Sequence, residues 1–94
     1  MRIISGTKKG HNLIAPRSKI ARPMTDKNRE TIFNIILHSK ELADCDFNLN
    51  DATVLDLFAG TGAFAFEAVS RGAKEAILVE NDQYMIDIIF KNVE

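Results

Sequence analysis

The sequence has 94 residues, of which 46% are hydrophobic and 27% charged, and its net charge is −1. This length allows at most one small domain, and this composition excludes a disordered chain. No apolar run approaches the ~20 residues of a membrane span, and the first residues lack the apolar core of a signal peptide. A single cysteine excludes an internal disulfide, and Cys45, His11 and His38 have no metal-site spacing. We therefore expect a soluble cytoplasmic protein with neither a metal nor a membrane partner.

The charges are divided unevenly along the chain. Residues 1–40 contain nine Lys or Arg and two acids, a balance of +7, whereas residues 41–94 contain three basic residues and eleven acids, a balance of −8. A basic segment of this kind favours a polyanion partner such as nucleic acid. A solvated basic surface without a partner is the alternative interpretation.

The first 40 residues are expected to form a hairpin followed by a helix. Residues 2–5 and 12–15 are short β-prone runs, and the Gly- and Lys-containing residues 6–10 between them predict a turn. Thr25 or Asp26 caps the helix that follows. The apolar face of this helix consists of residues spaced three and four apart, namely Ile32, Phe33, Ile36 and Leu37.

Strands and helices alternate from residue 53 onward. The expected elements are a strand at 53–58, a helix at 63–71, a strand at 75–79 and a helix capped by Asp82. Gly72 suits a left-handed cap after the first of these helices. The last helix carries an apolar side made of Ile86, Ile89, Phe90 and Val93. This β-α-β-α order is the opening half of a doubly wound sheet, so the predicted fold class is α/β.

We therefore divide the chain into three parts. Residues 1–40 are a basic hairpin and helix, residues 41–52 are a loop with a short helical piece, and residues 53–94 are the β-α-β-α part.

The turn after the first strand has the composition of a nucleotide-type site. The apolar strand contains Asp56 near its end, and Gly60 and Gly62 let the backbone turn tightly under a ligand. Nineteen residues after Thr61, the second strand is followed by Glu80. An acid about 20 residues beyond a glycine loop is placed to accept hydrogen bonds from ribose hydroxyls. The pattern therefore predicts a cofactor that contains adenosine.

The charge of the loop favours S-adenosylmethionine. A carboxylate at Asp56 would repel a pyrophosphate and attract a cation, and S-adenosylmethionine carries a sulfonium and an ammonium group but no phosphate. The third glycine of the dinucleotide pattern is replaced by Ala65. A nicotinamide or flavin nucleotide, and a tight turn without any ligand, are the alternatives.

Several short motifs occur in order along the whole chain. They are found in residues 1–6, 9–10, 22–26, 30–34, 56–62, 67–68, 70–73 and 79–80. Together they resemble the RsmD family of bacterial 16S ribosomal RNA methyltransferases, and the resemblance covers all 94 residues. Any one motif alone would indicate only the wider methyltransferase class.

The resemblance implies a Rossmann-like enzyme that moves a methyl group from S-adenosylmethionine to the exocyclic amine of a guanine in 16S ribosomal RNA. Residues 53–94 would then be the first half of its cofactor-binding domain. The implied cofactor-binding residues are Asp56, Phe58, Ala59, Gly60, Thr61, Gly62, Glu80 and Asn81. The implied RNA-facing residues are Arg2, Lys8, Lys9, Arg22, Thr25 and Arg29.

The sequence departs from the family pattern in the basic segment and in the helix after the glycine loop. His11 and Asn12 stand where basic residues are usual, and Met24 stands where a threonine is usual. Residues 64–66, Phe-Ala-Phe, are bulkier than the common Leu-Gly-Ile. These differences weaken one expected phosphate-binding patch but leave the cofactor residues in place.

The family's catalytic motif is an Asn or Asp followed by Pro-Pro and an aromatic residue, which grips the target amine and stacks on a flipped base. The 94 residues contain only Pro16 and Pro23, and neither begins such a motif. The sequence therefore predicts an N-terminal portion of the enzyme that is inactive alone and that either self-associates through bare strand edges or partly unfolds. The alternatives are a truncated, non-catalytic fragment that retains RNA or cofactor binding, and a methyltransferase acting on a small molecule or a protein.

Overall fold

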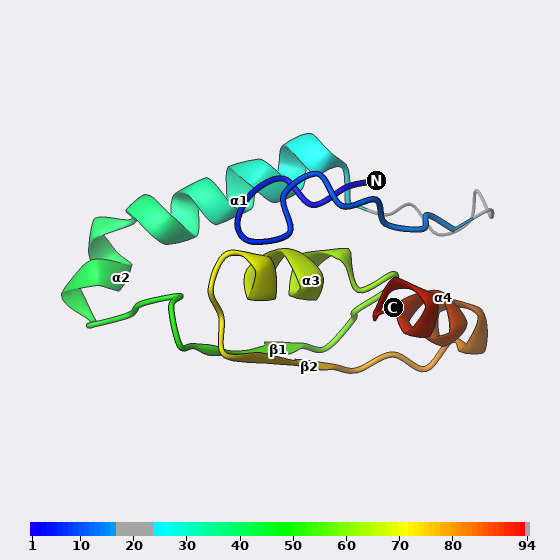
Figure 1. Cartoon of the computed structure of the whole chain (residues 1–94). Coiled ribbons are helices and arrows are strands. Elements are labelled where there is room, and N and C mark those ends of the chain that lie inside the picture. The colour runs from blue at the N-terminus through cyan, green and yellow to red at the C-terminus, as the bar shows by residue number, and fades with distance from the viewer. Residues whose placement is uncertain (17–23, 94) are drawn as a thin grey trace.

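Figure 1 shows three layers in the computed structural model, which describes residues 1–16 and 24–93. A two-stranded parallel sheet forms the first layer, α3 forms the second, and α1 lies with the N-terminal segment, residues 1–13, in the third. The elements in order are α1 (Asp26–His38), α2 (Lys40–Asp44), β1 (Thr53–Asp56), α3 (Ala63–Ser70), β2 (Glu75–Leu78) and α4 (Gln83–Val93). An α/β chain with a parallel sheet was predicted, and the described residues confirm it.

The N-terminal segment pairs with itself in the antiparallel sense that the sequence predicts, but over a shorter stretch than the predicted strands, and the Leu13 N–H donates to the Met1 carbonyl at 2.8 Å. A single antiparallel bridge joins Arg2 to Asn12, and Ile3 exchanges backbone hydrogen bonds with His11 and Gly10. The next two N–H groups, at residues 4 and 5, donate to a carboxylate on α3. The segment therefore combines a short antiparallel pairing with docking onto α3.

Helix α1 begins where the sequence predicts. Its N-cap is Thr25, whose Oγ1 accepts a hydrogen bond of 3.1 Å from the Asn28 N–H. Phe33 is buried and packs in one cluster with Leu49 and Ala68. The predicted apolar face is wrong at Leu37, which is 45% exposed. Figure 1 shows the reason, since the C-terminal part of α1 runs past the end of α3.

Helix α2 supplies the short helical piece predicted between residues 41 and 52. The strands are shorter than predicted, because the chain bends into the glycine loop after Asp56. Thr53 pairs with Glu75, and Asp56 pairs with Leu78. One face of the sheet packs against α3, while Leu55 and Ile77 on the opposite face are 57% and 51% exposed.

Helix α4 is capped by Asp82 as predicted, since its Oδ1 accepts a hydrogen bond of 2.9 Å from the Tyr84 N–H. Its buried side differs from the prediction. Met85 and Ile88 are buried, whereas Phe90 is 68% exposed. The helix has apolar residues on more than one side, so periodicity alone did not identify the side that is buried. Of the predicted apolar side, Ile86 and Ile89 are half-buried and Phe90 and Val93 are exposed.

Candidate functional site

The glycine loop joins β1 to α3 at the carboxyl end of the sheet, where open α/β folds bind their ligands. Gly60 and Gly62 have φ angles of +55° and +84°, a left-handed conformation that glycine adopts without strain. A Cβ at Gly62 would lie 2.7 Å from the ring of Phe66. A Cβ at Gly60 would meet no atom within 4 Å. Gly62 is therefore required for packing, while space for a ligand lies beside Gly60.

Glu80 ties the end of β2 to this loop. Its Oε1 accepts a hydrogen bond of 2.8 Å from the Gly60 N–H, and its Oε2 accepts one of 3.1 Å from the Asp82 N–H. The Ala59 N–H adds a backbone bond of 3.1 Å to the Val79 carbonyl. A carboxylate has about four acceptor sites, so Glu80 retains lone pairs for a ligand.

A cleft of about 700 Å³ opens beside the loop. It is lined by Pro16, Met24, Leu55, Asp56, Phe58, Ala59, Gly60, Thr61, Ala63, Phe64 and Met85. Asp56 carries the only charge among these described residues. Its Oδ1 accepts a hydrogen bond of 3.2 Å from the Phe58 N–H, which turns the carboxylate toward the start of the loop.

The predicted cofactor residues fall into two groups. Asp56, Phe58, Ala59, Gly60 and Thr61 all border the cleft. The other three do not line it: Gly62 is the buried N-cap of α3, and Glu80 and Asn81 follow the end of β2. Glu80 is nevertheless bonded to the loop itself, so the two parts of the sequence pattern do meet in space.

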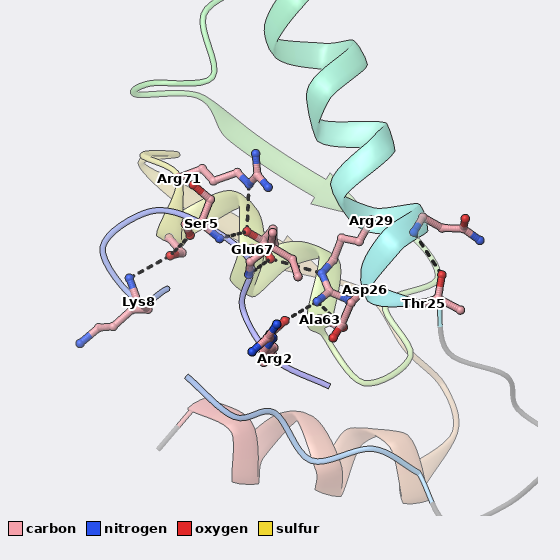
Figure 2. A network of polar contacts seen from close by, with 12 residues as sticks. Arg2, Ser5, Lys8, Thr25, Asp26, Arg29, Ala63, Glu67 and Arg71 are labelled. Atoms are coloured by element: carbon pink, nitrogen blue, oxygen red, sulfur yellow. Dashed lines mark hydrogen bonds and ion pairs between the residues drawn. The ribbon is translucent and has the colours of Figure 1, made fainter. Parts of the chain in front are cut away.

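A buried ion-pair network, which we call the polar clamp, lies further along α3, toward its C-terminal end. It consists of Glu67 on α3 with Arg29 on α1 and Arg71 at the end of α3 (Figure 2). The Glu67 carboxylate lies 3.3 Å from Arg29 Nε and 2.9 Å from Arg71 Nε. It also accepts bonds of 2.8 and 3.0 Å from the N–H groups of Ile4 and Ser5. The clamp therefore joins α1, α3 and the N-terminal segment at one carboxylate.

The side chains of Glu67 and Arg29 are fully buried. Burial by itself raises the pKa of the Glu67 carboxyl, but hydrogen bonds from the Ile4 N–H, Arg71, the Ser5 N–H and Arg29 outweigh it and hold the pKa below its usual range. The carboxylate is therefore ionised at neutral pH. The Arg71 guanidinium also lies over the ring of Phe33, 4.8 Å from its centroid.

Three of the predicted RNA-facing residues, Arg2, Lys8 and Lys9, are exposed on the surface. Thr25 is also exposed, and its hydroxyl oxygen caps α1. Arg22 lies outside the described residues. The exposed side chains of Lys8 and Lys9 are available to phosphate groups.

The expectation that Arg29 contacts RNA is corrected by the structure. Its guanidinium is fully buried and pairs with Glu67 and, at 2.8 Å, with Asp26. Its Nη2 also donates to the backbone carbonyl of Arg2. Nη1 is buried without a hydrogen-bond partner among the described residues. The family resemblance implied an RNA-facing Arg29, but the carboxylate of Glu67 on α3 holds its guanidinium inside.

Sequence reasoning missed the roles of Glu67 and Ser70. Glu67 stands in the apolar run 63–69, where a charged residue needs a buried partner. That pattern marked Glu67 as unusual, but it did not identify the partner, which lies 38 residues away in sequence.

Within residues 1–16 and 24–93, no group of three or more His, Cys, Asp or Glu side chains is arranged to hold a metal ion. No helix in that part of the chain is long and apolar enough to cross a membrane.

Comparison with known proteins identifies the family. The family described as conserved hypothetical protein 95 matches residues 1–94. Ribosomal RNA small subunit methyltransferase D of Escherichia coli strain K12 is 40% identical over 93 residues, which is 99% of this chain and 42% of that protein. The protein of the same name from Haemophilus influenzae is 34% identical over 94 residues, covering 100% of this chain and 44% of that protein.

Solved structures give the same result for the fold. A hypothetical protein of Thermus thermophilus superposes with a TM-score of 0.76 at 33% identity, covering 99% of this chain and 48% of that one. The yhhF protein of Escherichia coli superposes with a TM-score of 0.75 at 40% identity, covering 99% and 44%. The chain thus spans less than half the length of these relatives. Because the family match extends over all 94 residues, the chain belongs to this family, the RsmD family, and corresponds to its N-terminal portion.

Proposed function

We propose that this chain supplies the cofactor half and the RNA-facing segment of an S-adenosylmethionine-dependent methyltransferase that modifies a guanine amine in 16S ribosomal RNA. The observation that supports this proposal most directly is the charge of the cleft. Its described lining contains Asp56 and no Lys or Arg. A pyrophosphate would find no cation there, whereas a sulfonium or ammonium group would be attracted to the carboxylate.

The described residues fit this cofactor in three further respects. Space remains beside Gly60, where no atom lies within 4 Å of a Cβ position. Glu80 has acceptor sites left for ribose hydroxyls. The other lining side chains are largely apolar, which suits the thioether arm and the adenine. Asp56 would hold the cationic end and Glu80 the ribose.

The cofactor supplies an electrophilic methyl group on its sulfonium. The protein's part is to hold that group in line with the amine, because positioning supplies most of the rate in a direct transfer. Pro16 and Met24 border the same cleft, so the basic segment reaches the cofactor site. An rRNA substrate, the class named in the relatives from Escherichia coli and Haemophilus influenzae, fits this segment and would place the reaction in the cytoplasm.

The residues that grip the amine are not among these 94. We therefore propose that the chain by itself binds cofactor and RNA but does not transfer the methyl group. A non-catalytic fragment with the same two binding functions is the second candidate. The two are distinguished by the coding sequence that follows codon 94, since an Asn-Pro-Pro-aromatic motif in the same reading frame supports the methyltransferase and its absence supports the non-catalytic fragment.

The cofactor assignment is tested by titration calorimetry. S-adenosylmethionine should bind and NAD should not. Asp56→Asn should weaken S-adenosylmethionine binding by roughly tenfold, the value of one charge-assisted contact. Asp44→Asn removes the same charge from the exposed surface of α2 and is the control. Equal affinity of the wild type for NAD and S-adenosylmethionine would refute the assignment.

A further inference from the structure

Helix α3 lies between the two proposed binding elements. Its N-terminus is the glycine loop, with Gly62 as N-cap, and its last residue is Ser70. We call residues 7–9 the basic turn. This turn carries the exposed Lys8 and Lys9 and lies at the Ser70 end of α3. Eight helical residues at 1.5 Å each separate the two ends by roughly 12 Å. The helix is therefore a rigid spacer between a cofactor loop and a pair of cations.

The basic turn is fastened to Ser70 in the last turn of α3 by three hydrogen bonds, and a fourth joins Ser70 to Ser5. The Ser70 carbonyl accepts from the Thr7 N–H at 2.8 Å and from the Thr7 hydroxyl at 3.4 Å. The Ser70 hydroxyl donates to the Ser5 carbonyl at 2.7 Å and accepts from the Lys8 N–H at 3.0 Å. Lys8 is thus held by its backbone, while its side chain extends into solvent (Figure 2).

The polar clamp fastens the residues just before the turn. Glu67, one helical turn before Ser70, accepts from the Ile4 and Ser5 N–H groups, and the two arginines of the clamp hold its carboxylate in place. The close approach also requires Gly6. Its φ is +91°, and a Cβ there would lie 1.9 Å from the Ser70 carbonyl oxygen. Any side chain at this position would push the turn away from the helix.

We propose that Glu67, Ser70 and Gly6 are positioning residues for RNA. They fix Lys8 and Lys9 at one helix length from the cofactor loop, so that a phosphate bound at the basic turn sets where the RNA strand enters the cleft. The inference rests on the proposed function, because it assumes an RNA substrate. It adds a distance-setting device to the proposal, since the lysines act from a backbone that α3 holds.

Two glycine substitutions form a matched pair for the test. Gly6 and Gly10 flank the basic turn, and both have positive φ, +91° and +83°. Alanine carries the same conformational strain at either position. A Cβ at Gly10, however, meets no atom within 4 Å. Only Gly6→Ala should therefore displace the turn from Ser70.

Binding of a 16S ribosomal RNA transcript is measured against salt concentration, and binding of S-adenosylhomocysteine is measured by calorimetry. Gly6→Ala should weaken RNA binding by roughly tenfold or more, because contacts to two charged groups are lost. The slope of log K against log salt should fall by about 1.4, the value for two single-strand phosphate contacts. The affinity for S-adenosylhomocysteine should not change, and Gly10→Ala should alter neither measurement.

A double substitution separates positioning from general destabilisation. Lys8→Ala with Lys9→Ala should lower the salt slope in the wild-type background but not in the Gly6→Ala background, where the lysines are already displaced. Equal effects in both backgrounds would overturn the inference. So would wild-type RNA binding by Gly6→Ala. If Gly6→Ala lacks the native circular dichroism spectrum, Ser70→Ala, which removes only the hydroxyl bonds, takes its place in the same cycle.

The inference and the proposed function fail in different ways. If the unaltered chain binds no 16S transcript, the proposed function is refuted and the positioning role is refuted with it. If the unaltered chain binds the transcript but the Gly6→Ala and Ser70→Ala variants bind it equally well, only the positioning role is refuted.

Discussion

Removal of Arg29 from the polar clamp should destabilise the chain strongly. Arg29→Met keeps much of the buried volume but removes the cation from Glu67 and from Asp26, and it frees the Arg2 carbonyl. Breaking a buried ion pair by deleting one partner costs about 3–5 kcal/mol, because the other charge is left buried. A chain of 94 residues has a total stability of about 5–14 kcal/mol. The variant should therefore lose a large fraction of its stability.

The assay is urea unfolding followed by circular dichroism. The control is Lys27→Met, which removes an exposed cation from the same helix and should change the unfolding free energy by about 0.5 kcal/mol or less. Glu67→Leu combined with Arg29→Met should cost less than the sum of the two single changes, by about 1–3 kcal/mol, since neither member of the Arg29–Glu67 pair is then left buried without the other. If Arg29→Met costs no more than Lys27→Met, the clamp does not stabilise the fold.

Four further predictions concern acid, cofactor, RNA and association. Hydrogen bonds hold the pKa of Glu67 below its usual value, so its contribution to the free energy of unfolding is complete above about pH 5 and is lost as the pH falls through the folded-state pKa. The urea midpoint of the wild type should therefore drop in acid, and the midpoint of Glu67→Gln should drop less. Glu80→Ala should weaken S-adenosylhomocysteine binding by roughly tenfold or more in calorimetry, whereas equal affinity would remove Glu80 from the site. Alanine at both Lys8 and Lys9 should lower the RNA salt slope by about 1.4; an unchanged slope would mean a merely solvated surface. The chain should self-associate in sedimentation experiments and transfer no tritium to RNA, and a monodisperse or active chain would contradict this.

The elements of this fold were predictable because their determinants are local. Thr25 caps α1 with an atom three residues away, and Asp82 caps α4 in the same manner. The glycine loop is defined by two residues that tolerate positive φ. Such patterns are complete within a few positions of sequence. They therefore gave the order of elements and the location of the cleft.

The docking of the N-terminal segment onto α3 was not predicted because its partner is distant in sequence. In an antiparallel hairpin only every second N–H group bonds to the opposite strand, and the others point outward. The N–H groups of Ile4 and Ser5 reach Glu67, more than 60 residues away. The same carboxylate pairs with Arg29, whose side chain is therefore buried. One buried acid thus accounts for both the docking that was not predicted and the wrong placement of Arg29, because no local pattern identifies the hydrogen-bond partners of a buried acid.

Glu80 makes a contact that its spacing in the sequence does not imply. The spacing from the glycine loop predicted an acid for the ribose, and the structure places that acid against the loop. It also shows a bond from the Gly60 N–H that spacing alone does not imply. A loss of affinity in Glu80→Ala would therefore combine a missing ribose acceptor with a looser loop. Glu80→Gln separates the two, because an amide oxygen can still accept the Gly60 bond.

The two faces of the sheet have different consequences for this chain. The hydrogen bonds that fasten the basic turn run to Ser70 of α3, on the covered face. The opposite face exposes Leu55, Leu57, Ile77 and Val79, each 47% or more exposed. An apolar sheet face of this kind promotes association, but it takes no part in the spacing between cations and cofactor. Association through that face and positioning of RNA through α3 are therefore separable properties, although both arise from the same two strands and one helix.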